Sequence, residues 1–192
     1  MERIVGDERA VKFYEEPKLF GKWDYKVKVA DKVFVDQIAV STTRSQVFVP
    51  HTAGRYQLKP FRKLACPIVE RLVNCVQFKG RNSGKKAQAI RIVKVVFDII
   101  YLMTRRNPIE ILIEAACKGG AREDRTRLGS GGGVKRQAVD VAPMRRLSQS
   151  LFFMCMGVRK TAMRSSTSYA ECLAKEIIAT ANGTVNPQAN GL

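Results

Sequence analysis

Lysine and arginine are the residues of this chain that point most directly to a chemistry. Between Arg55 and Lys94 the sequence holds eleven of them and a single acid, Glu70. The whole chain of 192 residues carries a formal net charge of +17. A folded surface this basic repels itself unless a polyanion lies against it, and neutralising phosphates with Lys and Arg releases condensed counterions. The sequence therefore predicts a nucleic-acid-binding protein.

Catalytic chemistry finds little support in the residues. His51 is the only histidine, so beyond it the chain offers no Ser–His or Cys–His couple and no multi-histidine metal site. Glu70, Glu110 and Glu114 are expected to form surface ion pairs with nearby bases rather than an acid–base pair. The sequence therefore predicts no catalytic residues, no metal and no cofactor. An RNA-processing enzyme acting through His51 or Glu70 is the alternative that stays open.

The five cysteines are odd in number and widely spaced, which fits free thiols in a reducing compartment better than a disulfide framework. They also lack the paired short spacing of a zinc site. No segment is typical of an export signal, and the longest apolar run, residues 151–156, is far shorter than the roughly 20 residues that cross a bilayer. We expect no membrane partner and a cytosolic location.

The segment 80–86, of sequence GRNSGKK, has the composition of a phosphate-binding loop but not its spacing. Three residues rather than four separate its glycines, and no Ser or Thr follows the lysine, which argues against an NTPase. Arg81, Lys85 and Lys86 would oppose the dipole of a helix that starts here, and a bound phosphate would explain that arrangement. The alternative is a helix that begins at Ala87, with these bases merely solvated.

Helical periodicity and helix boundary signals account for most of the chain. Pro67, Pro108 and Pro143 suit first helical positions, and Ser168 with Glu171 forms a candidate capping box. The predicted helices span about residues 32–40, 67–79, 85–104, 108–118, 143–164 and 169–182. The helix over 85–104 is expected to turn these apolar residues away from solvent: Ile92, Val95, Val96, Ile99 and Met103.

Residues 122–142 differ in kind from the helical segments. Two extended runs, 122–128 and 134–141, are joined by a glycine-rich tip suited to a tight reversal. Arg125 and Arg127 face one way and Arg122 and Asp124 the other, so neither face can be buried and the hairpin should project. We expect one domain: a partly extended N-terminal extension at 1–46, a helical RNA-binding domain at 47–183 with the ribbon at 122–142, and a polar tail at 184–192.

Several strings of the sequence closely resemble the universal small-subunit ribosomal protein family seven, in its eukaryotic form. They occur in order over about residues 17–181, and they include His51-Thr52-Ala53-Gly54-Arg55-Tyr56, Cys66-Pro67-Ile68-Val69-Glu70-Arg71-Leu72, the segment 80–86, Arg136-Gln137-Ala138-Val139-Asp140-Val141 and Ala170-Glu171-Cys172-Leu173-Ala174. The resemblance implies a mainly α fold: a single-domain bundle of about six helices with one protruding β-hairpin ribbon. It implies no catalytic activity.

The resemblance also implies a place in the cell and a set of partners. Family members bind the 3′ domain of small-subunit rRNA, help to assemble the head, and lie near the mRNA exit channel and the exit-site tRNA, beside other small-subunit proteins. This places the chain in cytoplasmic ribosomes, with assembly in the nucleolus. Two departures put contacts in question: Ser130 stands where the family commonly has arginine, and the tail at 184–192 is neutral rather than basic. A third, Ala142 where the family has serine, removes a helix cap.

The residues predicted to bind RNA are basic, with one asparagine, and they neutralise phosphates or grip them with a guanidinium fork. They are Arg55, Lys59, Arg62, Lys63, Arg71, Lys79, Arg81, Asn82, Lys85, Lys86, Arg91 and Lys94 on the body, and Arg122, Arg125, Arg127, Lys135, Arg136, Arg145 and Arg146 on the ribbon and its base. The alternative is a DNA-binding or chromatin-type basic helical module, which would bind duplex DNA and folded RNA equally well.

Overall fold

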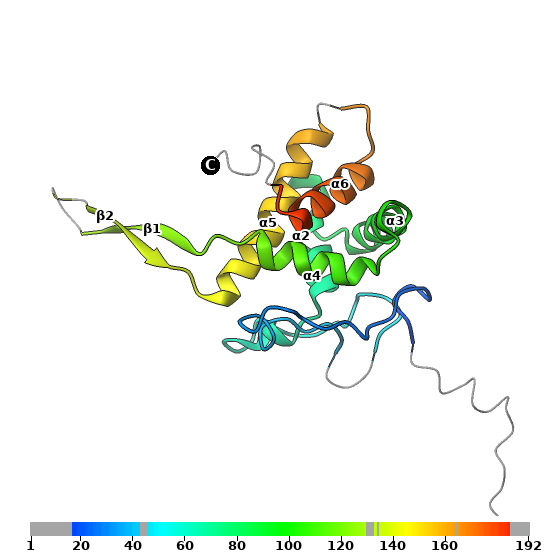
Figure 1. Ribbon diagram of the computed structural model, residues 1–192, viewed down its shortest axis with the longest axis horizontal. Helices are drawn as coiled ribbons and strands as arrows, with labels where there is room; N and C mark the ends of the chain where they lie inside the picture. The colour runs from blue at the N-terminus through cyan, green and yellow to red at the C-terminus, as the bar shows by residue number, and fades with distance from the viewer. Residues whose placement is uncertain (1–16, 43–45, 130–132, 134, 164, 185–192) are drawn as a thin grey trace, which may run out of the picture.

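The computed structural model describes residues 17–42, 46–129, 133, 135–163 and 165–184. Within these residues the protein is mainly helical, with one antiparallel hairpin that stands away from the helical body, as predicted (Figure 1). The α-helices are α2 (Ile68–Val76), α3 (Lys86–Thr104), α4 (Pro108–Lys118), α5 (Pro143–Ala162) and α6 (Tyr169–Asn182). Two 3-10 turns, η1 (Arg62–Ala65) and η2 (Gly80–Asn82), flank α2, and the hairpin consists of β1 (Glu123–Leu128) and β2 (Lys135–Asp140).

The core lies where α6 packs against α3, α4 and α5. Each of these helices contributes large side chains that are almost completely buried, because its apolar residues recur at helical spacing on one side. They are Phe97 and Ile100 of α3, Ile109 and Leu112 of α4, Leu147 and Leu151 of α5, and Leu173 and Ile177 of α6. Helix α2 joins this body through contacts with α3 and α5. The body is therefore the rigid element on which the loops and the ribbon are mounted.

Helix boundaries set by local signals agree with the predictions. The side-chain oxygen of Asn107 accepts from the N–H of Ile109 at 3.1 Å, and α4 spans the predicted residues. Ser168 Oγ accepts from the N–H of Glu171 at 3.3 Å, and Gly183, with φ 80°, ends α6. Helix α2 ends earlier than predicted, at Val76, and Pro67 precedes it as the capping residue rather than as its first residue.

The predicted helix over 32–40 is wrong, since the structure has only turns there. The N–H of Ile38 bonds to the carbonyl of Phe34 at 3.0 Å, which closes one turn, but no helix continues from it. Phe34 and Ile38 are buried in the main core, whereas Val33 and Val35 are half exposed. Tertiary packing of the two buried side chains fixes this segment, and nothing stabilises the further turns that a helix needs.

The segment 17–42 packs against the helical body as an extended layer. It lies below α4 in the view of Figure 1, alongside the loop that precedes α2, and it is coil over the stretch predicted to be extended. Leu19 and Phe34 are completely buried in the same core as the helices. The ring of Trp23 lies 5.1 Å from that of Tyr101 of α3, centroid to centroid. These residues therefore contribute to the core.

The buried face of α3 differs from the predicted one. Its buried residues are Ala89, Val93, Val96, Phe97 and Ile100. Of the predicted set, Val96 is buried and Ile92 and Ile99 are half-buried, but Val95 and Met103 are exposed by 49% and 56%. Both stripes have helical spacing, so the sequence pattern alone does not decide between them; the packing of α6 against α3 does.

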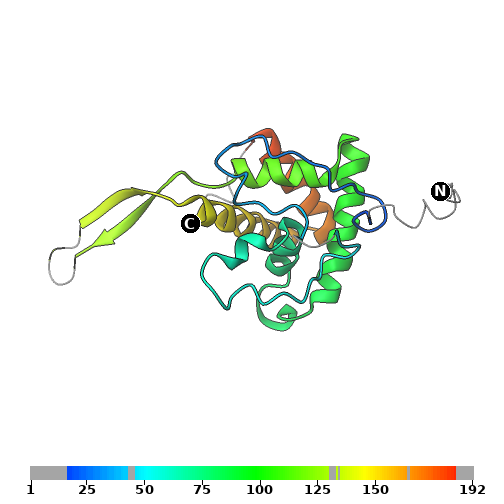
Figure 2. The ribbon, with the colours of Figure 1, turned by 90° about the horizontal axis from the view of Figure 1, so that it is seen from below.

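The hairpin projects from the body beside the start of α5, as Figure 2 shows from below. Every residue of its two strands is exposed except Thr126, which is half-buried. Only Val141 and Ala142 separate β2 from α5. The N–H of Val141 donates to the carbonyl of Arg122, which extends the pairing toward the body. The predicted tip residues 130–132 and 134, Ser130 among them, lie outside the described residues.

Candidate nucleic-acid interface

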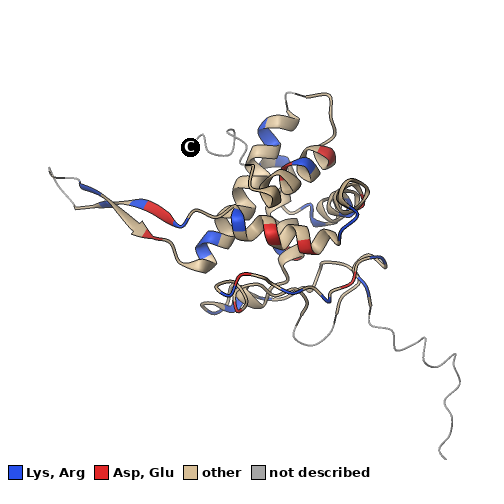
Figure 3. Ribbon diagram, in the orientation of Figure 1, with Lys and Arg blue, Asp and Glu red and all other residues tan. Residues whose placement is uncertain are grey.

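The residues predicted to bind RNA lie before and on α3, on the ribbon and at the start of α5. Lys and Arg lie along the ribbon, on α5 and in the loop layer, whereas acids mark α4 and the root of the ribbon (Figure 3). Sixteen of the nineteen predicted residues are exposed. They are Arg55, Lys59, Arg62, Lys63, Lys79, Arg81, Asn82 and Lys85 before α3, Arg91 and Lys94 on α3, Arg122, Arg125, Arg127, Lys135 and Arg136 on the ribbon, and Arg145 on α5. Arg71, Lys86 and Arg146 are half-buried, and each has a specific neighbour inside the protein.

The strand register makes the outer part of one ribbon face cationic. Directly opposed residues lie on the same face of an antiparallel pair, and side chains alternate along each strand. Arg127 lies opposite Arg136 and Arg125 lies opposite Ala138, so three guanidinium groups share one face. No carboxylate among the described residues forms an ion pair with any of the three. Since like charges directly opposite one another are destabilising, this face is suited to hold an anion.

The root of the ribbon carries the opposite charge. Glu123 lies directly opposite Asp140, and Asp124 lies beside them on the other face. The ribbon is therefore polarised, with acids near the body and bases toward the tip. A polyanion would therefore be attracted most strongly to the outer half of the ribbon. The sequence did not reveal this polarity, because the register of the two strands was unknown.

The second face of the ribbon has a mixed character. It carries Thr126, Leu128, Gln137 and Val139, with Lys135 opposite Leu128 at the outer end. Leu128 and Val139 are exposed by 45% and 39%. Apolar side chains on a projecting, solvent-exposed hairpin are unusual for an element with no core of its own. This face therefore offers apolar contacts beside the cationic ones.

Glu70 does not form the predicted surface ion pair; its carboxylate is buried. It accepts hydrogen bonds from Lys86 Nζ at 2.7 Å, from Thr52 Oγ1 at 2.7 Å and from the N–H of Thr52 at 3.3 Å. Thr52 Oγ1 also lies 2.7 Å from the hydroxyl of Tyr56. The predictions for Glu110 and Glu114 are confirmed, since both form exposed ion pairs with Arg106. A buried charge with this many partners acts as an anchor.

This anchor positions the loop that carries Arg55. The network fixes Thr52 and Tyr56 against α2, so the exposed Arg55 between them projects from a held loop. A Cβ at Gly54 would lie 2.5 Å from the ring of Tyr56, so only glycine fits beneath that ring. The sequence showed the residues of this loop as a motif, but not that they tie the loop to α2.

The electrostatics of Glu70 favour its charged form. Burial by itself would raise the pKa of this carboxyl group, but the hydrogen bonds from Lys86 and Thr52 and the charge of Lys86 outweigh burial, so the pKa lies below its ordinary value of 4.5. The ammonium of Lys86 is correspondingly engaged inside the protein. Of the two lysines at the start of α3, only Lys85 is exposed.

The segment 80–86 forms the turn η2 followed by the start of α3. The helix begins at Lys86, with Lys85 before it and Ala87 after it. This boundary lies between the two predicted alternatives, a helix start that binds phosphate and a helix that begins at Ala87 with solvated bases, and it does not decide between them. Lys85 is the capping residue and supplies no side-chain hydrogen bond, and the first turn contains no acid. Free amides and exposed cations at one helix terminus suit a phosphate group.

Three of the thiols, those of Cys66, Cys117 and Cys155, are poor nucleophiles. All five cysteines are free. Burial raises the pKa of Cys66 to about 12 and that of Cys117 to about 11, and it raises the pKa of Cys155 as well. Since the thiolate is the reactive form, these groups are inert at neutral pH. The described part of the chain contains no group of three His, Cys, Asp or Glu placed to hold a metal ion, and no helix in it is long and apolar enough to cross a membrane.

Comparisons with known proteins identify relatives over most of the chain. The family described as Ribosomal protein S7p/S5e matches residues 39–189. The small ribosomal subunit protein uS7 of Entamoeba histolytica is 55% identical over 163 residues, which cover 84% of this chain and 79% of the relative. The protein of the same name from Dictyostelium discoideum is 49% identical over 172 residues, which cover 89% of each chain. The resemblance seen in the sequence is thereby confirmed.

Proposed function

The chain belongs to the ribosomal protein S7p/S5e family, and on that premise we propose that it binds the 3′ domain of small-subunit rRNA and helps to assemble the head of the subunit. Its role is that of a structural component of the small ribosomal subunit and not that of an enzyme. The finer placement that we propose is near the mRNA exit channel and the exit-site tRNA, in contact with neighbouring small-subunit proteins. Assembly would begin in the nucleolus.

The observation that supports this proposal best is the pairing of Arg127 with Arg136 on an exposed ribbon. Two guanidinium groups directly opposite one another raise the free energy of an isolated hairpin, which is itself marginal in water. A phosphate between or beside them converts that repulsion into attraction, because each guanidinium fork can donate two hydrogen bonds to the oxygens of one phosphate. Electrostatics thus favours the ribbon lying along a polyanion.

The body supplies a second set of contacts. The exposed bases before and on α3, at residues 55–63, 79–85 and 91–94, lie on a backbone that the fold already places, so binding need only orient their side chains. We propose that these residues contact rRNA phosphates together with Arg122, Arg125, Arg127, Lys135, Arg136 and Arg145. Arg71, Lys86 and Arg146, which are half-buried, would act differently: Lys86 holds Glu70, and Arg146 packs its guanidinium 4.8 Å from the ring of Phe34.

Binding to rRNA fragments tests the proposal. With about eight phosphates contacted, log affinity for a 3′-domain rRNA junction should fall against log salt with a slope of about −6 to −7. The purified chain should prefer this junction to duplex DNA of equal length and charge. Equal affinity for the two would favour a general basic module, and a slope near −1 would contradict the electrostatic account.

A further inference from the structure

A cavity of about 590 Å³ opens between the loop that follows His51, helix α2 and helix α5. The loop contributes residues 54–58, α2 contributes Arg71 and Asn74, and α5 contributes Ser148. Its volume falls within the range of small-ligand sites. Three of the residues that line it are cationic and none is acidic. A cavity with this lining can hold a group rich in acceptors.

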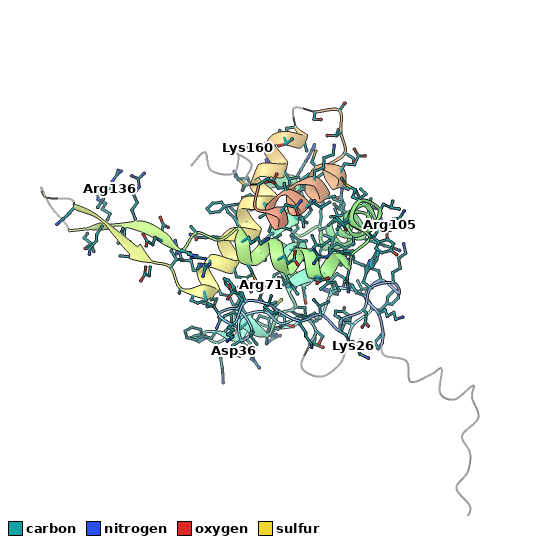
Figure 4. All side chains as sticks on the ribbon, viewed as in Figure 1. Lys26, Asp36, Arg71, Arg105, Arg136 and Lys160 are labelled. Carbon is teal, nitrogen blue, oxygen red and sulfur yellow. The ribbon has the colours of Figure 1, made fainter. Side chains whose placement is uncertain are left out.

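Arg71 is the charged group that this cavity surrounds most closely. Its side chain is half-buried, and one guanidinium nitrogen donates to Ser148 Oγ at 3.0 Å. Figure 4 shows Arg71 toward the middle of the molecule, whereas Arg136 and Lys160 extend from its periphery. Burial lowers the pKa of Arg71, and no carboxylate is among the charges that act on it. A guanidinium has five N–H donors, and Ser148 takes one of them within the described structure.

A desolvated cation without an acid beside it is costly unless other acceptors face it. Glu70, the adjacent residue in the chain, is buried but bonded to Lys86 and Thr52 instead. The remaining donors of Arg71 therefore suit acceptors that come from outside the protein. The cationic rim, formed by Arg55 and Lys63, is exposed and suits phosphates.

We propose that this cavity binds the base of an unpaired RNA nucleotide, guanine best of all, with the flanking phosphates on Arg55 and Lys63. Arg71 has only donors, so it selects a base edge with two acceptors, and guanine O6 and N7 match the spacing of an arginine fork. Tyr56, Leu58 and Leu151 are among the apolar residues that line the cavity. Such walls favour a base over a phosphate inside the cavity. The inference rests on the proposed function and adds a specific nucleotide site to it.

The experiment compares variants of the full chain in binding the 3′-domain rRNA junction. Arg71→Gln should lower affinity by about five- to 150-fold. The salt slope should stay the same, because a contact to a base releases no counterions. Ser148→Ala is the matched control, since it removes the same internal hydrogen bond and leaves the guanidinium in place. Lys160→Met, on the far end of α5, removes a charge of the same sign outside the cavity.

A second measurement does not depend on whether a variant folds. The wild-type chain is titrated with 5′-GMP, 5′-AMP and inorganic phosphate, and NMR signals of the Arg71 side chain and of Ser148 are followed. Guanine in the cavity predicts shifts with 5′-GMP that are larger than those with 5′-AMP and absent with phosphate alone. Equal shifts with all three probes, or shifts confined to the ribbon, would overturn the proposal.

The outcomes separate the inference from the proposed function. If the wild-type chain does not prefer the rRNA junction, the proposed function is wrong, whatever the affinity of Arg71→Gln. A wild-type chain that binds the junction, with Arg71→Gln binding equally well, overturns the base site alone. Arg71→Gln that loses affinity together with about one unit of salt slope also overturns it, because that is the signature of a phosphate contact.

Discussion

The ammonium of Lys86 lies 2.7 Å from the carboxylate of Glu70, and this ion pair joins the first residue of α3 to the first turn of α2. The side chain of Glu70 is only 3% exposed and that of Lys86 is 23% exposed. The same carboxylate holds the loop through Thr52. The loop at Thr52, α2 and α3 are thus held together by one acid. Loss of the Glu70 carboxylate should lower the stability of the protein and change the position of Arg55.

Replacing Glu70 with Gln should destabilise the protein by about 2 kcal/mol at pH 7, because charge-assisted hydrogen bonds to Lys86 and Thr52 are lost. Urea unfolding followed by circular dichroism would measure the difference. Glu114→Gln is the matched control: it also breaks an ion pair, but an exposed one, and should change stability by about 0 to 1 kcal/mol. Equal losses in the two variants would mean that burial of Glu70 adds nothing.

The contribution of Glu70 should depend on pH in a defined direction. The pKa of this carboxyl group is lower in the folded protein than its ordinary value of 4.5. Its stabilising contribution is therefore complete above pH 4.5 and is lost as the pH falls through the lower, folded-state pKa. The difference in unfolding free energy between wild type and Glu70→Gln should shrink below pH 4.5. A difference that grows on acidification would contradict the assignment.

The two lysines at the start of α3 should give different phenotypes. Lys85 is exposed, so Lys85→Met should reduce the salt slope of rRNA binding by about one unit and leave stability nearly unchanged. Lys86 is bonded to Glu70, so Lys86→Met should lower the midpoint of urea unfolding and leave the slope unchanged. Filter binding across a series of salt concentrations, with unfolding measured in parallel, separates the two roles. Identical salt slopes in the two variants would show that this division is wrong.

The ribbon should become more stable, and bind less well, when its opposed charges are relieved. Arg136→Thr removes one member of the pair with Arg127 and introduces a residue that favours strands. Amide hydrogen exchange in β1 and β2 of the free protein should slow, while affinity for the rRNA junction falls. Gln137→Thr, on the other face, should slow exchange without the loss of affinity. A ribbon variant that improves both properties would contradict a role for this pair in RNA binding.

Much of the fold could be predicted because the signals are local. Asn107 with Pro108 opens α4, and Ser168 opens α6, through hydrogen bonds that reach only two or three residues along the chain. Likewise, the glycine cluster and the charge pattern of the two runs were enough to predict a projecting hairpin, since neither run has an apolar face. Elements of this kind need no knowledge of distant contacts.

What could not be predicted depends on partners far away in the sequence. Arg146 packs on Phe34, 112 positions earlier, and Arg71 bonds to Ser148, 77 positions later. These contacts decide which predicted RNA-binding residues face solvent and which are held inside. The same reason explains the wrong face of α3, because the choice between two stripes of equal period is made by α6. A local sequence pattern shows which residues share a helix face, but not which element packs against that face.

The start of α5 lacks a side-chain cap, and restoring one should stabilise the protein. Ala142 precedes the helix with extended backbone (φ −59°, ψ 142°) and provides no side-chain oxygen. Ala142→Ser would place a hydroxyl oxygen at the capping position, near the N–H groups of the first turn, for a gain of about 0.5 to 2 kcal/mol. Ala142→Val, which offers no acceptor, should give no gain. Thermal unfolding of the three proteins measures the effect, and equal melting temperatures would count against it.

Phe34 tests whether the layer formed by residues 17–42 belongs to the cooperative fold. Its ring is completely buried between the helical body and this layer, and the guanidinium of Arg146 lies over it. Phe34→Ala should therefore cost about 3 to 5 kcal/mol in a single unfolding transition, because the cavity is left in the main core. Val35→Ala, at a neighbouring position that is 51% exposed, should cost less than about 0.5 kcal/mol.

The shape of the unfolding transition of Phe34→Ala shows whether residues 17–42 unfold together with the helical body. If the layer were a separate extension, Phe34→Ala would loosen residues 17–42 without moving the main transition, and the urea midpoint would stay where it is in the wild type. Loss of the Trp23 fluorescence signal before the loss of helical circular dichroism would indicate the same. Coincident transitions by both probes, shifted together to lower urea, are expected, because Trp23 packs on Tyr101 of α3 in the same core. The loops that carry the exposed bases would then depend on this layer for their position.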